Sequence, residues 1–363
     1  MKKTLIALAV LGATSSVAMA SNVTLYGKVS EAVVVSKVKG VDATTQLKSG
    51  FDAGSRWGIK GVEDLGNGYK VGFVLEQGFN ADNGTESSAD YAFNRETSFY
   101  VAGDFGKVGV GRFGSLASGT GSYSILGGWA LGTSYDAGSF NTFDGTLRVD
   151  NGVVYVAPTV GGLTISAMYS NNTKDVAKGY KFENDVAVEV KAHNDSTHKW
   201  SENDHYYGIG AQYNAGDFAL NVIFEAQDNK SSDKDALYQI DLGASYNLGS
   251  VTPMFAYRYQ TQDNERETHT FGLSAKAPVA GGTAKVGVRY RIEKLDGTAK
   301  PATGADDGSV WTINAAYEYK LSKRTTLWAY GGYAEGDDIL DKKVEDNVSY
   351  NGYQLGVGLT HNF

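Results

Sequence analysis

Histidine is the side chain most often used for metal binding and for acid–base chemistry near neutral pH, and three of the five histidines of this chain lie close together. His193, His198 and His205 are accompanied by Asp195 and Asp204, so this segment carries five groups that could bind a transition metal. Their spacing fits no common type of metal site. We therefore predict that the chain has no metal site.

Two other patterns could indicate a nucleotide-binding site or a catalytic site, but neither has the residues around it that such a site requires. Gly109, Gly111 and Gly114 form a G-x-G-x-x-G pattern, but no amphipathic helix follows them as a dinucleotide site requires. A hydrolase would need a histidine paired with a nucleophile, and no nucleophile motif accompanies His269 or His361. The sequence therefore predicts a protein that is not an enzyme and that needs no cofactor.

The start of the chain has the features of a secretory signal peptide. Lys2 and Lys3 precede a short apolar run, and small residues lead to a cleavage site after Ala20. We predict a signal peptide over residues 1–20 and one domain over residues 21–363. Without the two lysines the formal charge is 31 − 41 = −10, which makes nucleic acid an unsuitable partner.

Composition favours a membrane β-barrel over a secreted soluble β-protein, which is the alternative. The longest aliphatic run after the signal peptide covers only residues 32–35, so the mature chain could cross a membrane only as strands. The chain has no cysteine, 23 tyrosines, 46 glycines and only 4 prolines. Aromatic residues form interfacial girdles in barrels, glycine serves turns and crowded wall positions, and proline removes a hydrogen-bond donor.

Turn signals divide the chain into segments of alternating polarity, separated by connections that are short, then long, then short again. The short turns are expected at residues 64–68, 104–106, 158–162, 214–217, 247–250, 278–282 and 320–324. The long loops are expected at residues 38–51, 81–91, 114–147, 171–204, 228–235, 261–267, 294–308 and 335–348. Seven turns and eight loops join sixteen antiparallel strands, with tight periplasmic turns and longer external loops.

The last segment shows how such strands would separate lipid from water. Tyr353, Leu355, Val357 and Leu359 share one parity with the terminal Phe363, while mostly polar or small residues hold the other parity. A soluble β-sandwich also alternates, but an aromatic final residue is typical of outer-membrane barrels. We predict that the first strand, over 23–35, pairs with the last, over 350–363, so that no edge strand remains.

Several stretches along the mature chain resemble the Gram-negative porins of the betaproteobacterial type. They are VTLYGKV at 23–29, SRWGIKGVEDLGNGYKVGFVLEQGF at 55–79, FNRETSFYVAG at 93–103, VGVGR at 108–112, LRVDNGVVYVAP at 147–158, LSKRT at 321–325 and GLTHNF at 358–363. The resemblance implies a homotrimer of sixteen-stranded transmembrane barrels, each narrowed by an inward-folded third extracellular loop. Here that loop would cover residues 114–147.

The resemblance also implies which residues narrow the pore, because basic residues of the wall face acidic residues of the third loop in such porins. Matched motif by motif, the constriction would contain Lys28, Arg56, Arg95 and Arg148 on the wall, with Asp136 and Asp144 on the loop. The chain departs from the family where Ser30 replaces the usual aspartate. It also lacks the Pro-Glu-Phe motif of enteric relatives. Whether Arg95 or its neighbour Glu96 faces the lumen stays open, because Phe99 shares the parity of Arg95.

Together these features predict an outer-membrane porin for passive diffusion of small hydrophilic solutes and ions. Four basic residues against two acidic ones suggest a preference for anions, set by a transverse field. The partners implied are outer-membrane lipid, lipopolysaccharide and two further copies of the chain. The alternatives are a channel specific for a sugar or an organic anion, or an adhesin on the same barrel. Tyr123, Trp129 and Tyr135 of the third loop could form the aromatic track that a sugar channel needs.

Overall fold

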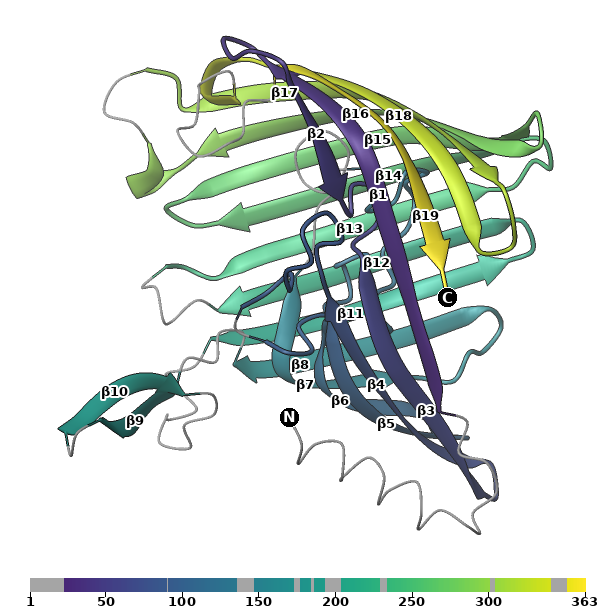
Figure 1. Ribbon diagram of the computed structural model, residues 1–363, viewed down its shortest axis with the longest axis vertical. Helices are drawn as coiled ribbons and strands as arrows, with labels where there is room; N and C mark the ends of the chain where they lie inside the picture. The colour runs from purple at the N-terminus through teal and green to yellow at the C-terminus, as the bar shows by residue number, and fades with distance from the viewer. Residues whose placement is uncertain are drawn as a thin grey trace.

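The sixteen predicted strands form a closed antiparallel barrel in the computed structural model. The structure describes residues 23–89, 91–135, 147–172, 177–183, 186–192, 204–228, 234–300, 304–340 and 351–363. The signal peptide predicted over residues 1–20 lies outside this part and stays a prediction. Figure 1 shows the strands wrapping into one curved wall, with the first strand beside the last.

Each strand of the wall pairs with its neighbours along the chain. The first eight strands of the wall are β1 (Thr24–Val38), β2 (Thr44–Ser49), β3 (Arg56–Gly66), β4 (Tyr69–Gly78), β5 (Glu96–Gly103), β6 (Gly106–Gly114), β7 (Arg148–Val156) and β8 (Leu163–Asn172). They are followed by β11 (His205–Ala215), β12 (Phe218–Asp228), β13 (Leu237–Tyr246), β14 (Thr252–Gln262), β15 (Arg266–Val279), β16 (Gly282–Leu295), β17 (Asp307–Lys320), β18 (Thr325–Gly336) and β19 (Gly352–Asn362). β2 and β3 both pair with β1, at its two ends, and so share one position in the wall. The described wall therefore has sixteen positions.

The alternation of side chains explains which face of the wall is apolar. In β19, Leu355 and Val357 are 51% and 57% exposed on the outside, whereas Gln354 and Thr360 are buried inside. The same arrangement recurs along β15, β16 and β17, where apolar residues point outward and polar ones inward. An exposed apolar band of this kind is what a barrel presents to lipid.

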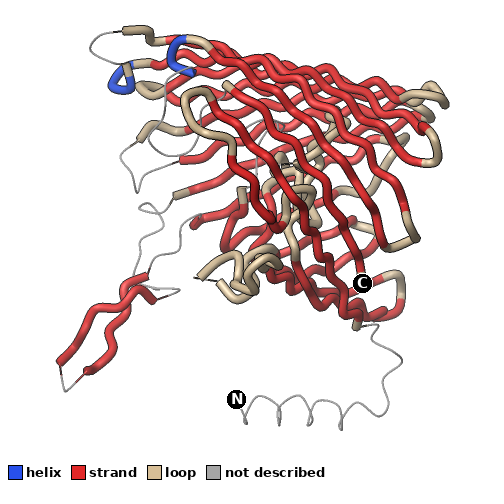
Figure 2. The backbone as a smooth tube through the Cα atoms, turned by 45° about the horizontal axis from the view of Figure 1, so that its top comes forward, coloured by secondary structure: helices blue, strands red, loops and turns tan. Residues whose placement is uncertain are grey.

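Local turn chemistry accounts for the short connections. Asn67 and Gly68 join β3 to β4 with φ values of 51° and 82°, and Ala280 and Gly281 join β15 to β16 with 47° and 80°. Two successive positive φ values define the type I′ turn, whose twist matches that of the flanking strands. Figure 2 shows these tight turns at one end of the barrel and longer loops at the other. The predicted alternation of short turns and long loops is confirmed.

The barrel closes between its first and last strands, as predicted. β1 pairs with β19 from Lys28 opposite Asn362 to Val38 opposite Gly352. The backbones of Gly27 and Phe363 exchange two hydrogen bonds of 3.1 Å beyond this ladder. A side chain at Gly27 would meet the Phe363 ring, so this glycine makes room for the terminal aromatic residue. Within the described wall every strand other than the short β2 pairs with neighbours on both sides, so the ladders satisfy its backbone groups without water.

Two predicted loops contain strands that the sequence did not indicate. β2 lies inside the loop expected over 38–51, and a hairpin of β9 (Ala177–Glu183) and β10 (Val186–Ala192) lies inside the loop expected over 171–204. β2 is short and polar, so its pattern gives little periodicity to detect, whereas β10 does alternate, with Val186, Val188 and Val190 on one parity. The described loops also contain two single-turn 3-10 helices, η3 (Gly297–Ala299) and η4 (Asp338–Leu340). No helix among the described residues is long and apolar enough to cross a membrane.

Candidate functional site

The described part of the third loop, residues 115–135, contacts the inner face of the wall. Its first residues are held by polar groups of β11, β12 and β14. The amide of Ala117 donates to Glu225 at 2.7 Å, and Arg258 donates to the carbonyl of Ala117 at 3.3 Å. Arg258 is also paired with Asp241 at 2.6 Å, and the amide of Leu116 donates to the Tyr206 hydroxyl at 3.4 Å. Because all these wall groups are buried, they fix the loop by hydrogen bonds that water does not weaken.

The middle of this segment approaches the wall backbone closely. A Cβ atom placed on Gly243 of β13 would lie 2.6 Å from the carbonyl carbon of Gly127. Gly128, with φ of 85°, would meet the backbone of Gly243 and Phe255 in the same way. Further along, the amide of Ala130 donates to Ser274 of β15 at 2.9 Å. Glycine on both sides is therefore what permits the loop to lie against β13.

The end of the segment is fixed by an aromatic cluster. Tyr135 stacks on Tyr330 with ring centroids 4.9 Å apart and meets Trp328 edge-on at 5.4 Å. Phe51, from the stretch between β2 and β3, stacks on Trp328 at 5.8 Å and completes the cluster. The Tyr135 hydroxyl donates to Glu318 at 2.7 Å. Burial, and then the nearby Glu318 carboxylate, raise the pKa of Tyr135 above its ordinary value, so the hydroxyl keeps its proton.

Between this loop and the wall of β1 to β5 lies a cavity of about 870 Å³. The charged residues that line it are Lys28, Arg56, Lys60, Glu76, Arg95, Glu96 and Arg148. On the loop side the described lining consists of neutral residues, which are Gly119, Thr120, Gly121, Ser122 and Thr133. Among the described lining residues five are basic and two are acidic, so the formal charge is 5 − 2 = +3.

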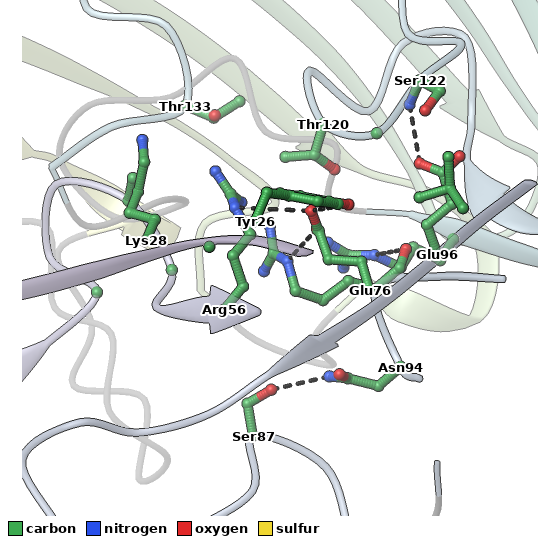
Figure 3. Close-up of a pocket in the computed structure, with 18 of the residues that line it drawn as sticks. Tyr26, Lys28, Arg56, Glu76, Ser87, Asn94, Glu96, Thr120, Ser122 and Thr133 are labelled. Atoms are coloured by element: carbon green, nitrogen blue, oxygen red, sulfur yellow. Dashed lines mark hydrogen bonds and ion pairs between the residues drawn. The ribbon is translucent and has the colours of Figure 1, made fainter. Parts of the chain in front are cut away.

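Glu76 lies at the centre of the polar contacts in this cavity. It accepts a hydrogen bond from Arg95 Nε at 2.7 Å and one from the Tyr26 hydroxyl at 3.0 Å, and Arg56 Nε lies 3.8 Å away. Arg148 Nε donates to the carbonyl of Arg95 at 2.9 Å. One carboxylate therefore orients two guanidinium groups, while a third is oriented by backbone. Figure 3 shows Tyr26, Arg56 and Glu76 beside one another in the cavity.

The position at which β5 begins explains how Arg95 and Glu96 can both face the cavity. The strand starts at Glu96, so Arg95 precedes it and does not follow the alternation that places Phe99 outside. Both side chains line the cavity. Glu96 is buried and accepts hydrogen bonds from the Ser122 amide at 3.0 Å and the Ser98 hydroxyl at 2.8 Å, so it ties the third loop to β5.

The structure brings together all four basic residues that the sequence singled out, in one cavity. Asp136 and Asp144 lie outside the described residues, as do His193 and His198. Ser30, the departure from the family pattern, is buried and bonds to Thr360 at 3.0 Å. Lys60 and Glu76 also line the cavity and were not predicted as site residues, and Glu96 was named only as the alternative to Arg95, although each has inward parity in its strand.

The aromatic residues considered for a sugar track are not available to a solute. Tyr123, Trp129 and Tyr135 are 3%, 8% and 0% exposed. Trp129 and Tyr135 belong to the cluster with Phe51, and Tyr123 packs edge-on against Phe113 at 5.0 Å. These rings anchor the loop and do not line the cavity.

A closed antiparallel barrel with an apolar outer face and a charged cavity inside defines a transmembrane channel of the porin class. A family model described as Gram-negative porin matches residues 7–339, and the chain belongs to this family. It is 29% identical to outer membrane porin protein 32 of Delftia acidovorans over the full length of both chains.

Solved structures show the same fold. An anion-selective porin from Comamonas acidovorans superposes with a TM-score of 0.71 at 24% identity, over 95% of this chain and all of that one. The trimer form of OmpT, an outer membrane protein of Vibrio cholerae, superposes with a TM-score of 0.62 at 17% identity, over 95% of this chain and all of that one. The protein is thus a porin of the bacterial outer membrane, and its family and fold are those of a channel.

Proposed function

We propose that this porin lets small hydrophilic solutes and ions diffuse passively across the outer membrane and that it prefers anions. The observation that carries the preference is the formal charge of +3 among the described residues of the cavity. Solutes pass between the third loop and the wall of β1 to β5, where these residues lie. No step of this function requires catalysis or a cofactor.

The basic residues act on an ion through a field that crosses the passage. Arg56, Arg95 and Arg148 hold positive charge on the wall, and the neutral polar groups of the loop face them. At physiological salt the field of a charge decays over about 8 Å, so these residues influence an ion in the cavity far more than charges at the loop tips do. An anion is stabilised on the arginine side without being held by a complete set of ligands, which permits rapid passage.

Substitution of Arg56 by serine tests this assignment. We expect Arg56→Ser to lower the anion preference, measured as the reversal potential of a planar bilayer under a salt gradient. Lys300→Ser, in an exposed external loop, is the matched control and should change it far less, because Lys300 lies outside the cavity. An unchanged reversal potential in folded Arg56→Ser would remove Arg56 from the selecting region.

A channel specific for organic anions is the second candidate, because three guanidinium groups line one cavity. Such a channel would bind its solute, so the flux of a dicarboxylate into liposomes would saturate and the solute would block chloride current. General diffusion predicts a flux that rises linearly with concentration. The burial of Tyr123, Trp129 and Tyr135 argues against a sugar channel.

We further propose a homotrimer in contact with outer-membrane lipid and lipopolysaccharide. The support is family membership, the trimeric form of the Vibrio cholerae neighbour, and the exposed apolar band of the wall. The unheated protein should migrate as a trimer in detergent gels and as a monomer after heating. A native mass of one chain in mild detergent would contradict this proposal.

A further inference from the structure

A second group of basic residues lies inside the barrel, toward the end with the short turns. Lys107 is fixed there by Tyr100 of β5 and Tyr123 of the third loop, whose ring centroids lie 4.5 and 4.3 Å from its ammonium group. Lys285 bonds to Glu318 at 2.6 Å, and Glu318 in turn holds Tyr135. Lys107 contacts Tyr123 directly and Lys285 is linked to Tyr135 through Glu318, so both lysines lie on the inner face.

Strand alternation adds further lysines to this face. Lys276 has the parity of the buried Ser274 in β15, Lys320 that of the buried Ala316 in β17, and Lys70 that of Glu76 in β4. The short-turn lysines are Lys70, Lys107, Lys276, Lys285 and Lys320. Asp64 and Glu318 are the described acidic residues on the inner face at this end, so the formal charge there is 5 − 2 = +3.

Acidic neighbours offset only part of the positive charge of the short-turn lysines. Lys276 and Lys285 are direct partners across β15 and β16, an arrangement that costs stability because like charges face each other. Lys276, Lys70 and Lys320 are exposed to water, so their charges act on the solution at this mouth. Asp64 is the ladder partner of Lys70 and offsets its charge. The excess positive charge therefore lies on β15 to β17 and on β6.

The opposite mouth carries charge of the opposite sign. The described residues of the connections at the long-loop end, outside the strands and leaving out those that line the cavity, contain twelve acidic and three basic residues, which gives 3 − 12 = −9. The acidic residues are Asp42, Asp52, Asp82, Glu86, Asp204, Asp235, Asp263, Glu265, Asp296, Asp306, Asp337 and Asp338, and the basic ones are Lys39, Lys234 and Lys300. The negative charge of the mature chain is thus concentrated at one end of the pore.

We propose that the short-turn lysines form a second anion-selecting region and that the contrast between the two mouths makes ion selectivity depend on the direction of a salt gradient. This inference rests on the proposed function, because it requires an open pore. The mouth in dilute solution dominates, since screening extends over about 30 Å at 0.01 M salt but about 10 Å at 0.1 M. Dilute salt at the short-turn mouth therefore strengthens anion preference, and dilute salt at the long-loop mouth weakens it.

The experiment measures reversal potentials in a tenfold gradient of potassium chloride, applied in both directions across the same oriented channels. The chain has no cysteine, so Ala43→Cys in the exposed first long loop gives a unique thiol. A bulky reagent that cannot cross the membrane then reports which side the long loops face. We expect the ratio of chloride to potassium permeability to differ at least about twofold between directions, which corresponds to about 0.4 kcal/mol.

Replacing exposed lysines tests their part in this difference. The triple variant Lys70→Gln, Lys276→Gln, Lys320→Gln should lose most of the directional difference and keep its conductance at 1 M salt, where screening shortens to about 3 Å. Lys107 and Lys285 are left in place because they support the third loop. Lys300→Gln, at the other mouth, is the matched control and should not reduce the difference.

The outcomes separate this inference from the proposed function. Equal anion preference in both directions overturns the directional inference and leaves the anion-preferring pore intact. A directional difference that persists in the triple variant overturns the assignment to the lysines. A channel without anion preference in either direction, measured at salt high enough to screen both mouths, counts against the cavity as the selecting region.

Discussion

Glu76 shows how one side chain can both position and offset the charges of a site. Its carboxylate contacts two arginines and a tyrosine, so it keeps the guanidinium groups extended into the cavity while it cancels part of their charge. Charge-assisted hydrogen bonds of this kind are short and directional, which makes the position of Arg95 well defined. The net field that an ion experiences is therefore the difference between the arginines and this carboxylate.

Replacing Glu76 by glutamine should raise anion preference. The change keeps a hydrogen-bond acceptor for Arg95 and removes one negative charge, so the formal charge of the described lining rises from +3 to +4. A screened charge that alters the energy of an ion by about 0.4 kcal/mol changes the permeability ratio about twofold. The reversal potential measures this ratio, and Glu335→Gln, at the exposed outer end of β18, is the control. A fall in anion preference would mean that Glu76 matters mainly by holding the arginines.

Four basic residues of the site were predicted because the family places basic residues on the wall, whereas Glu76 and Glu96 were not, although they lie in the same stretches that resemble the family. Lys28, Arg56 and Arg148 sit in stretches that resemble the family. Glu76 and Glu96 have inward parity in their strands. Parity alone does not show that these two side chains lie in the same cavity as Arg56, which comes from another strand. That convergence depends on register, which is a property of the closed sheet.

Among the elements, the third loop depends most on contacts far away in the sequence. Three kinds of contact hold its described part: buried polar groups at Ala117, backbone approach at Gly127 and Gly128, and the aromatic cluster around Tyr135. Each involves a different group of strands, so the loop is fixed at several points along its length. A fixed loop keeps the cavity open at a constant width.

Gly243→Ala tests the middle anchor. The new methyl group would lie 2.6 Å from the Gly127 carbonyl carbon and would also meet the Asn221 side chain, so that side chain must shift and the loop must move by about 1 Å to restore normal contact. Overpacking of this kind costs about 1–3 kcal/mol, which a closed barrel tolerates. Because the loop is pushed away from β13 and toward β1 to β5, single-channel conductance should fall.

Gly331→Ala in β18 is the matched control for this variant. Its Cβ atom would meet only the end of the Leu355 side chain, at 3.4 Å, so conductance should stay near the parent value. Unchanged conductance in folded Gly243→Ala would show that the loop does not limit the passage.

The sequence predicted the wall better than it predicted the inward segments. Alternation and type I′ turn residues are local signals, so the positions of the short turns and long loops follow from them. β2 is six residues long within a polar stretch, and the inward position of Phe51 depends on Trp328 and Tyr330 from the other end of the chain. No local pattern contains that information.

For the whole molecule, net charge is a poor guide to what the pore selects. The chain carries a formal charge of −8, yet the described cavity is positive and the described long-loop connections are negative. Because fields in salt solution are short-ranged, an ion responds to the residues it passes and not to the total. We therefore expect selectivity in this barrel to be set by where charges are placed along the axis.

The central claim is that ions cross this barrel through a water-filled passage lined by excess positive charge. The most direct test compares single-channel conductance in potassium chloride with that in lithium chloride and in potassium acetate, each corrected for the conductivity of the bulk solution. If anions carry most of the current, exchanging chloride for the slower acetate lowers conductance more than exchanging potassium for the slower lithium. A larger drop in lithium chloride, or no channels at all from the folded protein, would contradict the account.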